Sequence, residues 1–199
     1  MKGTVIYTQR VEIVEGYRER RDCADQNIPL FLEACGYIPV PVSNVVSDLE
    51  SFVEKTAPVG IMLTGGNSLV KYEGTAPERD RTDRELIGIA IKKKIPLYGF
   101  CRVMQSVLDY FGCKLETVEG HVAVRHTLHG EWGSITVNSY HNQACKEVKK
   151  PLQATAKTED GVIEAAVCSE NDIIVTMWHP EREIPFREAD IERVKNLFG

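Results

Sequence analysis

The sequence changes character within the stretch PLYGFCRVMQ, residues 96–105. A short apolar run stops at Gly99, a single cysteine follows, and apolar residues then recur at helical spacing from Val103 onward. The sequence therefore predicts a strand-to-helix turn that carries Cys101. Such a turn exposes the sulfur above a sheet, and the helix N-terminus stabilises the thiolate, so the position suits a nucleophile. Because an isolated cysteine is more often a small buried hydrophobe, the other motifs must decide between the two interpretations.

Length and composition suit one globular domain. The chain has 199 residues, of which 43% are hydrophobic, and it contains neither a low-complexity tract nor an internal repeat. We therefore expect a single domain over residues 1–199. The N-terminal residues turn polar too soon for a signal peptide, and no apolar run reaches the roughly 18 residues of a membrane span. We expect a soluble, cytoplasmic protein with no membrane partner.

Charge and cysteine spacing narrow the chemistry. A net charge of -5 argues against binding to nucleic acid, which requires excess positive charge. The six cysteines occur without a C-x-x-C pair or the Cys/His spacing typical of zinc sites, so we expect reduced thiols and no metal. A small-molecule substrate is the favoured partner, and a homodimer is the candidate assembly.

The N-terminal half alternates strands with helices. Strands are expected over residues 4–8, 37–42, 59–63 and 96–100, and helices near residues 27–35 and 48–55. Thr82 and Glu85 have the spacing of a capping box at the head of a further helix. Pro39 and Pro41 favour an edge position for the second strand. The alternation indicates βαβ units and a parallel sheet.

From Gly112 onward the pattern becomes β-rich. Short strands are expected over residues 122–124, 134–137, 153–157, 162–167 and 173–177, with a hairpin turn at Asp160-Gly161. Residues 187–198 have the spacing of an amphipathic helix. We therefore predict an α/β three-layer sandwich with a mostly parallel, flavodoxin-like central sheet and a β-rich C-terminal half.

Two motifs follow predicted strands and can meet Cys101, because ligands of open parallel sheets bind at the carboxyl ends of strands. Gly65-Gly66 allows a close backbone approach, with N–H groups facing an oxyanion together with that of Arg102. The alternative is an ordinary glycine turn. His179 and Glu181 follow the last strand. If the backbone stays extended there, they face the same side, and the carboxylate orients a histidine base.

Four other histidines compete for the role of base. They are His121, His126, His129 and His141. A lone histidine is usually structural, so the pairing with Glu181 is what favours His179.

Several motifs together resemble class I glutamine amidotransferases. GFCRVMQ, residues 99–105, is similar to their nucleophile motif G-[IVF]-C-x-G-x-Q, and TMWHPERE, residues 176–183, is similar to their W-H-P-E. The resemblance extends to TGGNS (64–68), VNSYHNQ (137–143), DGVIEA (160–165) and YTQR (7–10) with RRD (20–22), and so covers nearly the whole chain. Val103 departs from the family, which usually has glycine there, and its Cβ is expected to crowd the turn or reshape the pocket.

The resemblance implies a role for each matching residue. Cys101 is the implied nucleophile, His179 the base and Glu181 its orienting group. Gly66 and Arg102 are implied to supply the oxyanion N–H groups. The implied substrate-binding residues are Gly65, Gln105, Ser139, Tyr140 and His141.

The arginine after the cysteine and the segments NSYHNQ and DGVIEA are more similar to the free-standing γ-glutamyl hydrolase branch. That branch includes γ-glutamyl-γ-aminobutyrate hydrolase and γ-glutamyl-CDP-amidate hydrolases. The resemblance implies a cysteine hydrolase that forms a γ-glutamyl thioester and releases glutamate and an amine, with no cofactor. Two alternatives remain: a glutaminase subunit that feeds ammonia to a synthetase partner, and a binding protein without activity.

Arginines near the predicted nucleophile favour an anionic leaving group. Arg18, Arg20 and Arg21 follow the first strand, and Arg102 and Arg182 flank the catalytic candidates. Because guanidinium groups pair with phosphate, we expect Arg20 and Arg21 to bind a phosphoryl-bearing amine. The favoured substrate is then γ-glutamyl-CDP-amidate, which yields the cytidine diphosphoramidate of capsule phosphoramidate biosynthesis. The alternatives are ordinary surface ion pairs and γ-glutamyl-γ-aminobutyrate as substrate.

Overall fold

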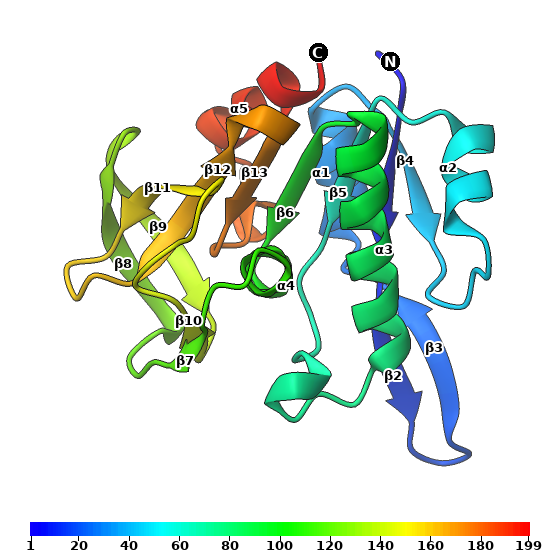
Figure 1. Cartoon of the computed structure of the whole chain (residues 1–199), viewed down its shortest axis with the longest axis horizontal. Coiled ribbons are helices and arrows are strands. Elements are labelled where there is room, and N and C mark those ends of the chain that lie inside the picture. Colours follow the sequence, from blue (N-terminus) through cyan, green and yellow to red (C-terminus); the bar gives the residue numbers. More distant parts are fainter.

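A nine-stranded sheet runs through the centre of the computed structural model, which describes residues 1–199 (Figure 1). One half is parallel and contains β4 (Ile38–Val42), β1 (Thr4–Thr8), β5 (Gly60–Leu63), β6 (Leu97–Phe100) and β13 (Ile173–Thr176), in that order. The other half is antiparallel and contains β12 (Ile163–Cys168), β11 (Gln153–Lys157), β8 (Val122–Gly130) and β9 (Gly133–Tyr140). The expected α/β class with a β-rich C-terminal half is confirmed.

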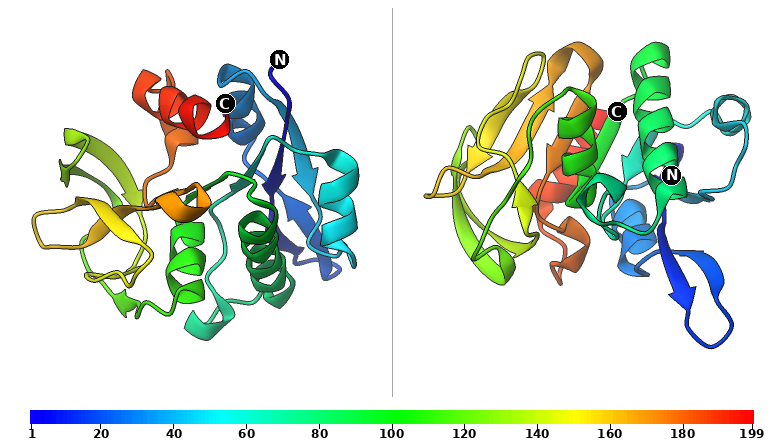
Figure 2. Two further views of the ribbon diagram at one scale, coloured as in Figure 1. Left: turned by 45° about the horizontal axis from the view of Figure 1, so that its top comes forward. Right: turned by 60° about the horizontal axis from the view of Figure 1, so that its bottom comes forward.

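Helices cover both faces of the parallel half and complete three layers (Figures 1 and 2). On one face lie α2 (Leu49–Thr56), α3 (Pro77–Lys93) and α4 (Arg102–Tyr110), and on the other lie α1 (Asn27–Ala34) and α5 (Glu188–Phe198). Neighbouring strand residues alternate between the two cores. Leu97 packs with the first set of helices, whereas Tyr98 packs with the second. This double burial explains why β5 and β6 are apolar throughout.

A hairpin projects from the end of β1 and was not expected from the sequence (Figures 1 and 2). It pairs β2 (Arg10–Val14) with β3 (Glu19–Cys23). Most of its side chains are exposed, so apolar periodicity is absent there. Long-range contacts stabilise it instead. The Asn67 side chain accepts from the Val11 N–H (2.8 Å) and donates to the Val11 carbonyl (2.9 Å), which fastens the hairpin to the glycine-rich loop.

Other predictions differ from the structure in detail. α3 begins at Pro77, so Thr82 is not its N-cap, and the Thr82 hydroxyl donates instead to the Glu78 carbonyl within the helix (2.9 Å). β8 and β9 extend well beyond the expected strands because their polar residues pair across a long hairpin. β4 is an edge strand, as Pro39 and Pro41 indicated.

The remaining elements are short. β7 (Glu116–Thr117) pairs with β10 (Gln143–Ala144), and three 3-10 turns span η1 (Val70–Tyr72), η2 (Ser169–Asn171) and η3 (Pro180–Arg182). No helix is both long and apolar enough to cross a membrane. The parallel strands β5, β6 and β13 end at one edge of the sheet, and this edge brings Gly65, Cys101 and His179 together.

Candidate active site

Cys101 occupies a strained turn between β6 and α4. Its backbone has φ 55° and ψ -116°, a conformation that L-residues rarely adopt. The turn is held from both sides, because the Cys101 N–H donates to the Thr176 carbonyl (2.8 Å) and the Cys101 carbonyl accepts from the Met104 N–H (2.9 Å). The predicted strand-to-helix turn is therefore present. Strain of this kind is typical of a nucleophile held at a helix N-terminus.

Val103 does not enter the site. It is fully buried, and it packs on Gly99, where a Cβ would lie 2.5 Å from Val103 Cγ1. The glycine in the strand thus accommodates the valine in the helix. Val103 lines neither cavity, because its side chain points into the core, and its effect falls on Gly99 at the end of β6.

His179 and Glu181 form a buried pair, with Nδ1 and Oε1 2.7 Å apart. An extended backbone was expected here. Instead, the chain turns into η3 after His179, and this 3-10 turn brings the Glu181 carboxylate back toward the ring. Asn138 holds the turn by accepting from the His179 N–H and donating to the His179 carbonyl (both 2.9 Å). Phe100 and Tyr140 pack edge-on against the imidazole.

The electrostatics of His179 favour a protonated ring. Burial lowers the pKa of His179, but the neighbouring Cys101 and Glu181 outweigh burial and raise the pKa to about 9. An imidazolium beside a thiol is the arrangement that stabilises a thiolate. The pair is therefore arranged for nucleophilic chemistry.

Gly65 lies between the cysteine and the histidine. A Cβ at this position would lie 2.8 Å from His179 Cε1 and 3.4 Å from Cys101 Cβ. Only glycine leaves room for both side chains. At the next residue, Gly66 has φ 95°, and its N–H donates no hydrogen bond within the protein. Together with the N–H at the start of α4, it is available to an oxyanion above Cys101.

Two cavities adjoin His179, and Cys101 lines the first of them. The first is lined by Gln105, Tyr140, His141, Asn142 and Gln143, and Gln105 donates to the Gln143 carbonyl (2.9 Å). Three of the implied substrate-binding side chains therefore face one cavity. Ser139 does not, because it is fully buried and its hydroxyl donates to the His121 carbonyl (2.6 Å).

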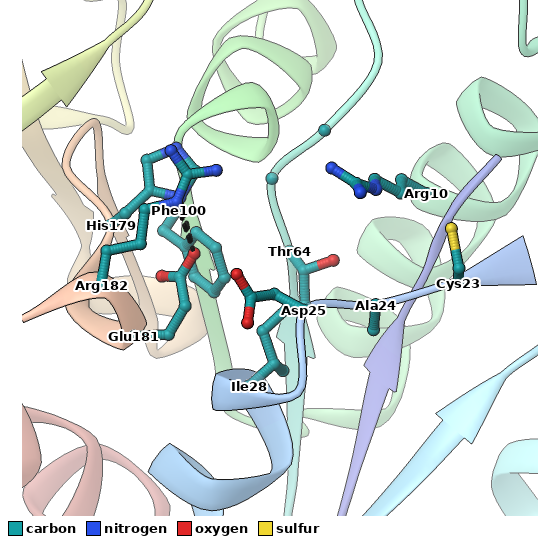
Figure 3. Close-up of a pocket in the computed structure, with 12 residues that line it drawn as sticks. Arg10, Cys23, Ala24, Asp25, Ile28, Thr64, Phe100, His179, Glu181 and Arg182 are labelled. Carbon is teal, nitrogen blue, oxygen red and sulfur yellow. Dashed lines mark hydrogen bonds and ion pairs between the residues drawn. The ribbon is translucent and has the colours of Figure 1, made fainter. Parts of the chain in front are cut away.

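The second cavity extends from His179 toward the β2–β3 hairpin (Figure 3). Arg10 and Asp25 approach it from the N-terminal elements, whereas Glu181 and Arg182 approach it from η3. Arg10 also packs over Gly66, where a Cβ would lie 2.8 Å from Arg10 Cδ. Sequence reasoning did not single out Arg10, although it belongs to the segment YTQR that carried the resemblance.

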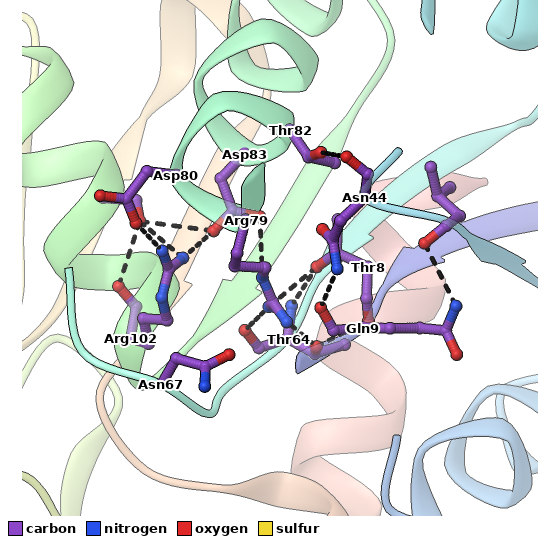
Figure 4. Close-up of polar contacts among 12 residues, drawn as sticks. Thr8, Gln9, Asn44, Thr64, Asn67, Arg79, Asp80, Thr82, Asp83 and Arg102 are labelled. Atoms are coloured by element: carbon purple, nitrogen blue, oxygen red, sulfur yellow. Dashed lines mark hydrogen bonds and ion pairs between the residues drawn. The ribbon is translucent and has the colours of Figure 1, made fainter. Parts of the chain in front are cut away.

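The Arg102 side chain, at the edge of the first cavity, is directed toward α3 (Figure 4). It is 2% exposed and pairs with Asp80 and Asp83 of α3, so it is not free to receive an anion. Arg79 lies in the same network and donates to the Thr64 carbonyl (2.6 Å). Burial lowers the pKa of Arg79 to about 10. The network fixes the residue that precedes Gly65, a role that sequence reasoning did not detect.

The structure places Arg20 and Arg21 on the hairpin, away from the lining of both cavities. Arg20 pairs with Glu78 (2.5 Å) and donates to the Thr75 carbonyl (3.1 Å), and Arg21 pairs with Glu19 (2.6 Å). Arg18 shares that hairpin turn. The arginines with a side chain at the second cavity are instead Arg10 and Arg182.

The other histidines do not contact the His179–Glu181 pair. His141 lines the first cavity, yet its Nε2 is hydrogen-bonded to Glu164 (3.0 Å). His121 and His126 lie beside His141, and His129 is exposed on β8. The geometry thus distinguishes His179, which alone among them combines a carboxylate partner with proximity to Cys101.

An α/β sheet with a cysteine at a strand-to-helix turn and a buried His–Glu pair just after the neighbouring strand defines a class I glutamine amidotransferase-like fold. A glutamine amidotransferase of Thermotoga maritima has a similar structure, with a TM-score of 0.68 at 14% identity over 98% of this chain and 84% of that one. The Peptidase C26 family model matches residues 31–129 and 114–181, and the chain belongs to that family.

Two similar proteins are γ-glutamyl amide hydrolases. The γ-glutamyl-CDP-amidate hydrolase of Campylobacter jejuni is 29% identical over 184 residues, which cover 88% of each chain. The γ-glutamyl-γ-aminobutyrate hydrolase of Escherichia coli O157:H7 is 26% identical over 187 residues, which cover 73% of each. The expected family of γ-glutamyl amide hydrolases is therefore confirmed.

Proposed function

We propose that the chain hydrolyses a γ-glutamyl amide to glutamate and a free amine, with Cys101 as nucleophile. The observation that carries this proposal is the placement of His179, which is paired with Glu181 (2.7 Å) and adjoins Cys101 across Gly65. Glu181 fixes the ring orientation and stabilises the imidazolium. No metal or organic cofactor enters this reaction.

The reaction divides into two steps. The Cys101 thiolate attacks the amide carbonyl, the oxyanion accepts from the Gly66 and Arg102 N–H groups, and the His179 imidazolium protonates the leaving nitrogen as the C–N bond breaks. A γ-glutamyl thioester remains. His179, now neutral, takes a proton from water, the resulting hydroxide attacks the thioester, and glutamate and the thiolate–imidazolium pair are released.

The two cavities divide the substrate. Gln105, Tyr140 and Gln143 offer hydrogen-bonding groups to the glutamyl part in the first cavity. The leaving group then points toward Arg10 and Arg182, which line the second cavity. Arg10 pairs only with the exposed Glu12, and Arg182 lies 3.7 Å from Glu181. Two arginines at this position favour a phosphoryl-bearing amine, so γ-glutamyl-CDP-amidate is the proposed substrate and γ-glutamyl-γ-aminobutyrate the alternative.

A glutamate-release assay tests the reaction. We expect turnover of at least one γ-glutamyl amide by the wild-type protein and none by Cys101→Ala. Failure to hydrolyse glutamine, γ-glutamyl-CDP-amidate and γ-glutamyl-γ-aminobutyrate would contradict the proposal. Turnover of glutamine only in the presence of a synthetase would favour the glutaminase-subunit alternative.

The leaving group is tested by the ratio of kcat/KM on γ-glutamyl-CDP-amidate to that on γ-glutamyl-γ-aminobutyrate. A loss of activity that affects both substrates equally cancels in this ratio. We expect Arg10→Met to lower it about tenfold, the loss of one charge-assisted hydrogen bond. Arg20→Met, on the same hairpin but paired with Glu78, is the matched control and should leave it unchanged. A drop in Arg20→Met alone would restore the assignment made from the sequence.

A further inference from the structure

Three histidines and one glutamate gather at the antiparallel end of the sheet, outside the catalytic pair. They are His121 before β8, His126 on β8, His141 after β9 and Glu164 on β12. We call these four residues the His3Glu cluster. Each offers one ligand atom, and the four atoms all lie within 4.8 Å of one another.

The three rings aim a nitrogen at the same carboxylate oxygen. Glu164 Oε1 lies 3.0 Å from His141 Nε2, 3.4 Å from His121 Nδ1 and 3.6 Å from His126 Nε2. In a tetrahedral zinc site with bonds of about 2.0–2.1 Å, ligand atoms lie roughly 3.3 Å apart. The three N–O separations already match this value, and the widest pair in the cluster must close by about 1.5 Å.

The carboxylate of Glu164 has no permanently charged partner. Glu164 is fully buried and pairs with no lysine or arginine, so the histidines are its only neighbours of possible positive charge. A buried carboxylate requires a cation or good hydrogen bonds. Glu164 Oε2, His121 Nδ1 and His126 Nε2 are nevertheless buried without any hydrogen-bond partner. His121 is 4% exposed and directs its unpaired nitrogen into the cluster.

An outer carboxylate orients one of the rings. His121 Nε2 lies 3.2 Å from Asp160 Oδ2, so an N–H on that nitrogen donates to the carboxylate. With Nε2 turned to Asp160, the nitrogen that faces the cluster is His121 Nδ1, 3.4 Å from Glu164 Oε1. Metal-binding histidines are commonly held by such an outer carboxylate.

We propose that the His3Glu cluster binds one Zn²⁺ ion. Three imidazole nitrogens and one carboxylate oxygen suit zinc rather than magnesium or calcium, which prefer oxygen ligands. With four protein ligands the site is structural. It links the β8–β9 hairpin to β12 and holds the loop in which His141 lines the first cavity.

The test measures binding of the metal alone, in a variant whose Cys101 thiol cannot contribute to the bound metal. In a tag-free Cys101→Ser background, chelator-treated protein is dialysed against Zn²⁺, and bound metal is measured by elemental analysis. We expect one equivalent in the parent protein, less than a tenth of an equivalent in His126→Ala and in Glu164→Gln, and one equivalent in His129→Ala. His129 lies on the same strand outside the cluster and is the matched control.

Co²⁺ provides a readout that needs no variant. The parent protein loaded with Co²⁺ should show the intense visible absorption of a tetrahedral site, and Zn²⁺ should abolish that absorption by displacing the ion. Zinc should also raise Tm in His129→Ala but not in His126→Ala. Absence of bound metal in the parent, a Co²⁺ spectrum of octahedral type, or binding that survives His126→Ala would overturn the proposal. None of these outcomes depends on hydrolase activity.

Discussion

Val103 Cγ1 occupies the space that a side chain on Gly99 would need, because a Cβ there would lie 2.5 Å away. We therefore expect Gly99→Ala to lower the free energy of unfolding by about 1–3 kcal/mol, the usual cost of overpacking a core. Adding Val103→Gly should recover part of this loss. Urea denaturation of the two single variants and the double variant measures the coupling.

Gly88→Ala is the matched control for that cycle. Gly88 lies within α3, where a Cβ would meet nothing closer than Tyr110 Oη at 3.7 Å. The change should stabilise the protein by up to about 1 kcal/mol. Equal destabilisation by Gly99→Ala and Gly88→Ala would show that Val103 is not the cause.

The strained backbone at Cys101 links stability to activity. A residue with φ 55° and ψ -116° is more easily glycine, so Cys101→Gly should increase the free energy of unfolding by about 1 kcal/mol. The same change should abolish glutamate release, as should Cys101→Ala, by several powers of ten. Circular dichroism with an activity assay checks both effects. An inactive variant that is also less stable would mean that the turn is not strained.

His179 and Glu181 should differ in the size of their effects. His179→Asn removes the group that transfers the proton, and we expect a loss nearly as large as that of Cys101→Ala. Glu181→Gln keeps the ring in place, so its loss in kcat should be smaller. Alkylation of Cys101 by iodoacetamide at neutral pH should slow in His179→Asn and persist in His141→Asn. The opposite pattern would make His141 the base.

Stability should depend on pH through His179. Its pKa is raised from 6.5 to about 9, so the folded protein holds the proton more tightly than the unfolded chain. The resulting stabilisation is complete below about pH 6.5 and is lost as the pH rises toward 9. The difference in free energy of unfolding between wild type and His179→Asn should shrink over that range. Parallel pH profiles of the two proteins would contradict this assignment.

The sequence by itself determined the central elements of the fold and the order of the site motifs. The spacing of apolar residues in strands and helices is a local property. The turn at Cys101 and the apolar strands before Gly65 and His179 could therefore be predicted from short segments. Parallel pairing then implies that the motifs after those strands share one edge of the sheet. The family resemblance implied a role for each of those residues.

Tertiary structure alone decided the contacts between distant segments. The β2–β3 hairpin depends on Asn67, 56 residues from Val11, and so leaves no local apolar pattern. The direction of Arg102 depends on Asp80 and Asp83, which α3 brings beside α4. A charged side chain pairs with whichever partner folding brings near it, and sequence spacing does not contain that information.

The His3Glu cluster has the same origin. Its members come from β8, β12 and the loops beside β8 and β9, and their spacing matches no metal-binding motif. They meet because the antiparallel half of the sheet folds the β8–β9 hairpin beside β12. Local periodicity in the sequence predicts secondary structure, whereas the charge environment of each buried group depends on which strands pair in the folded protein.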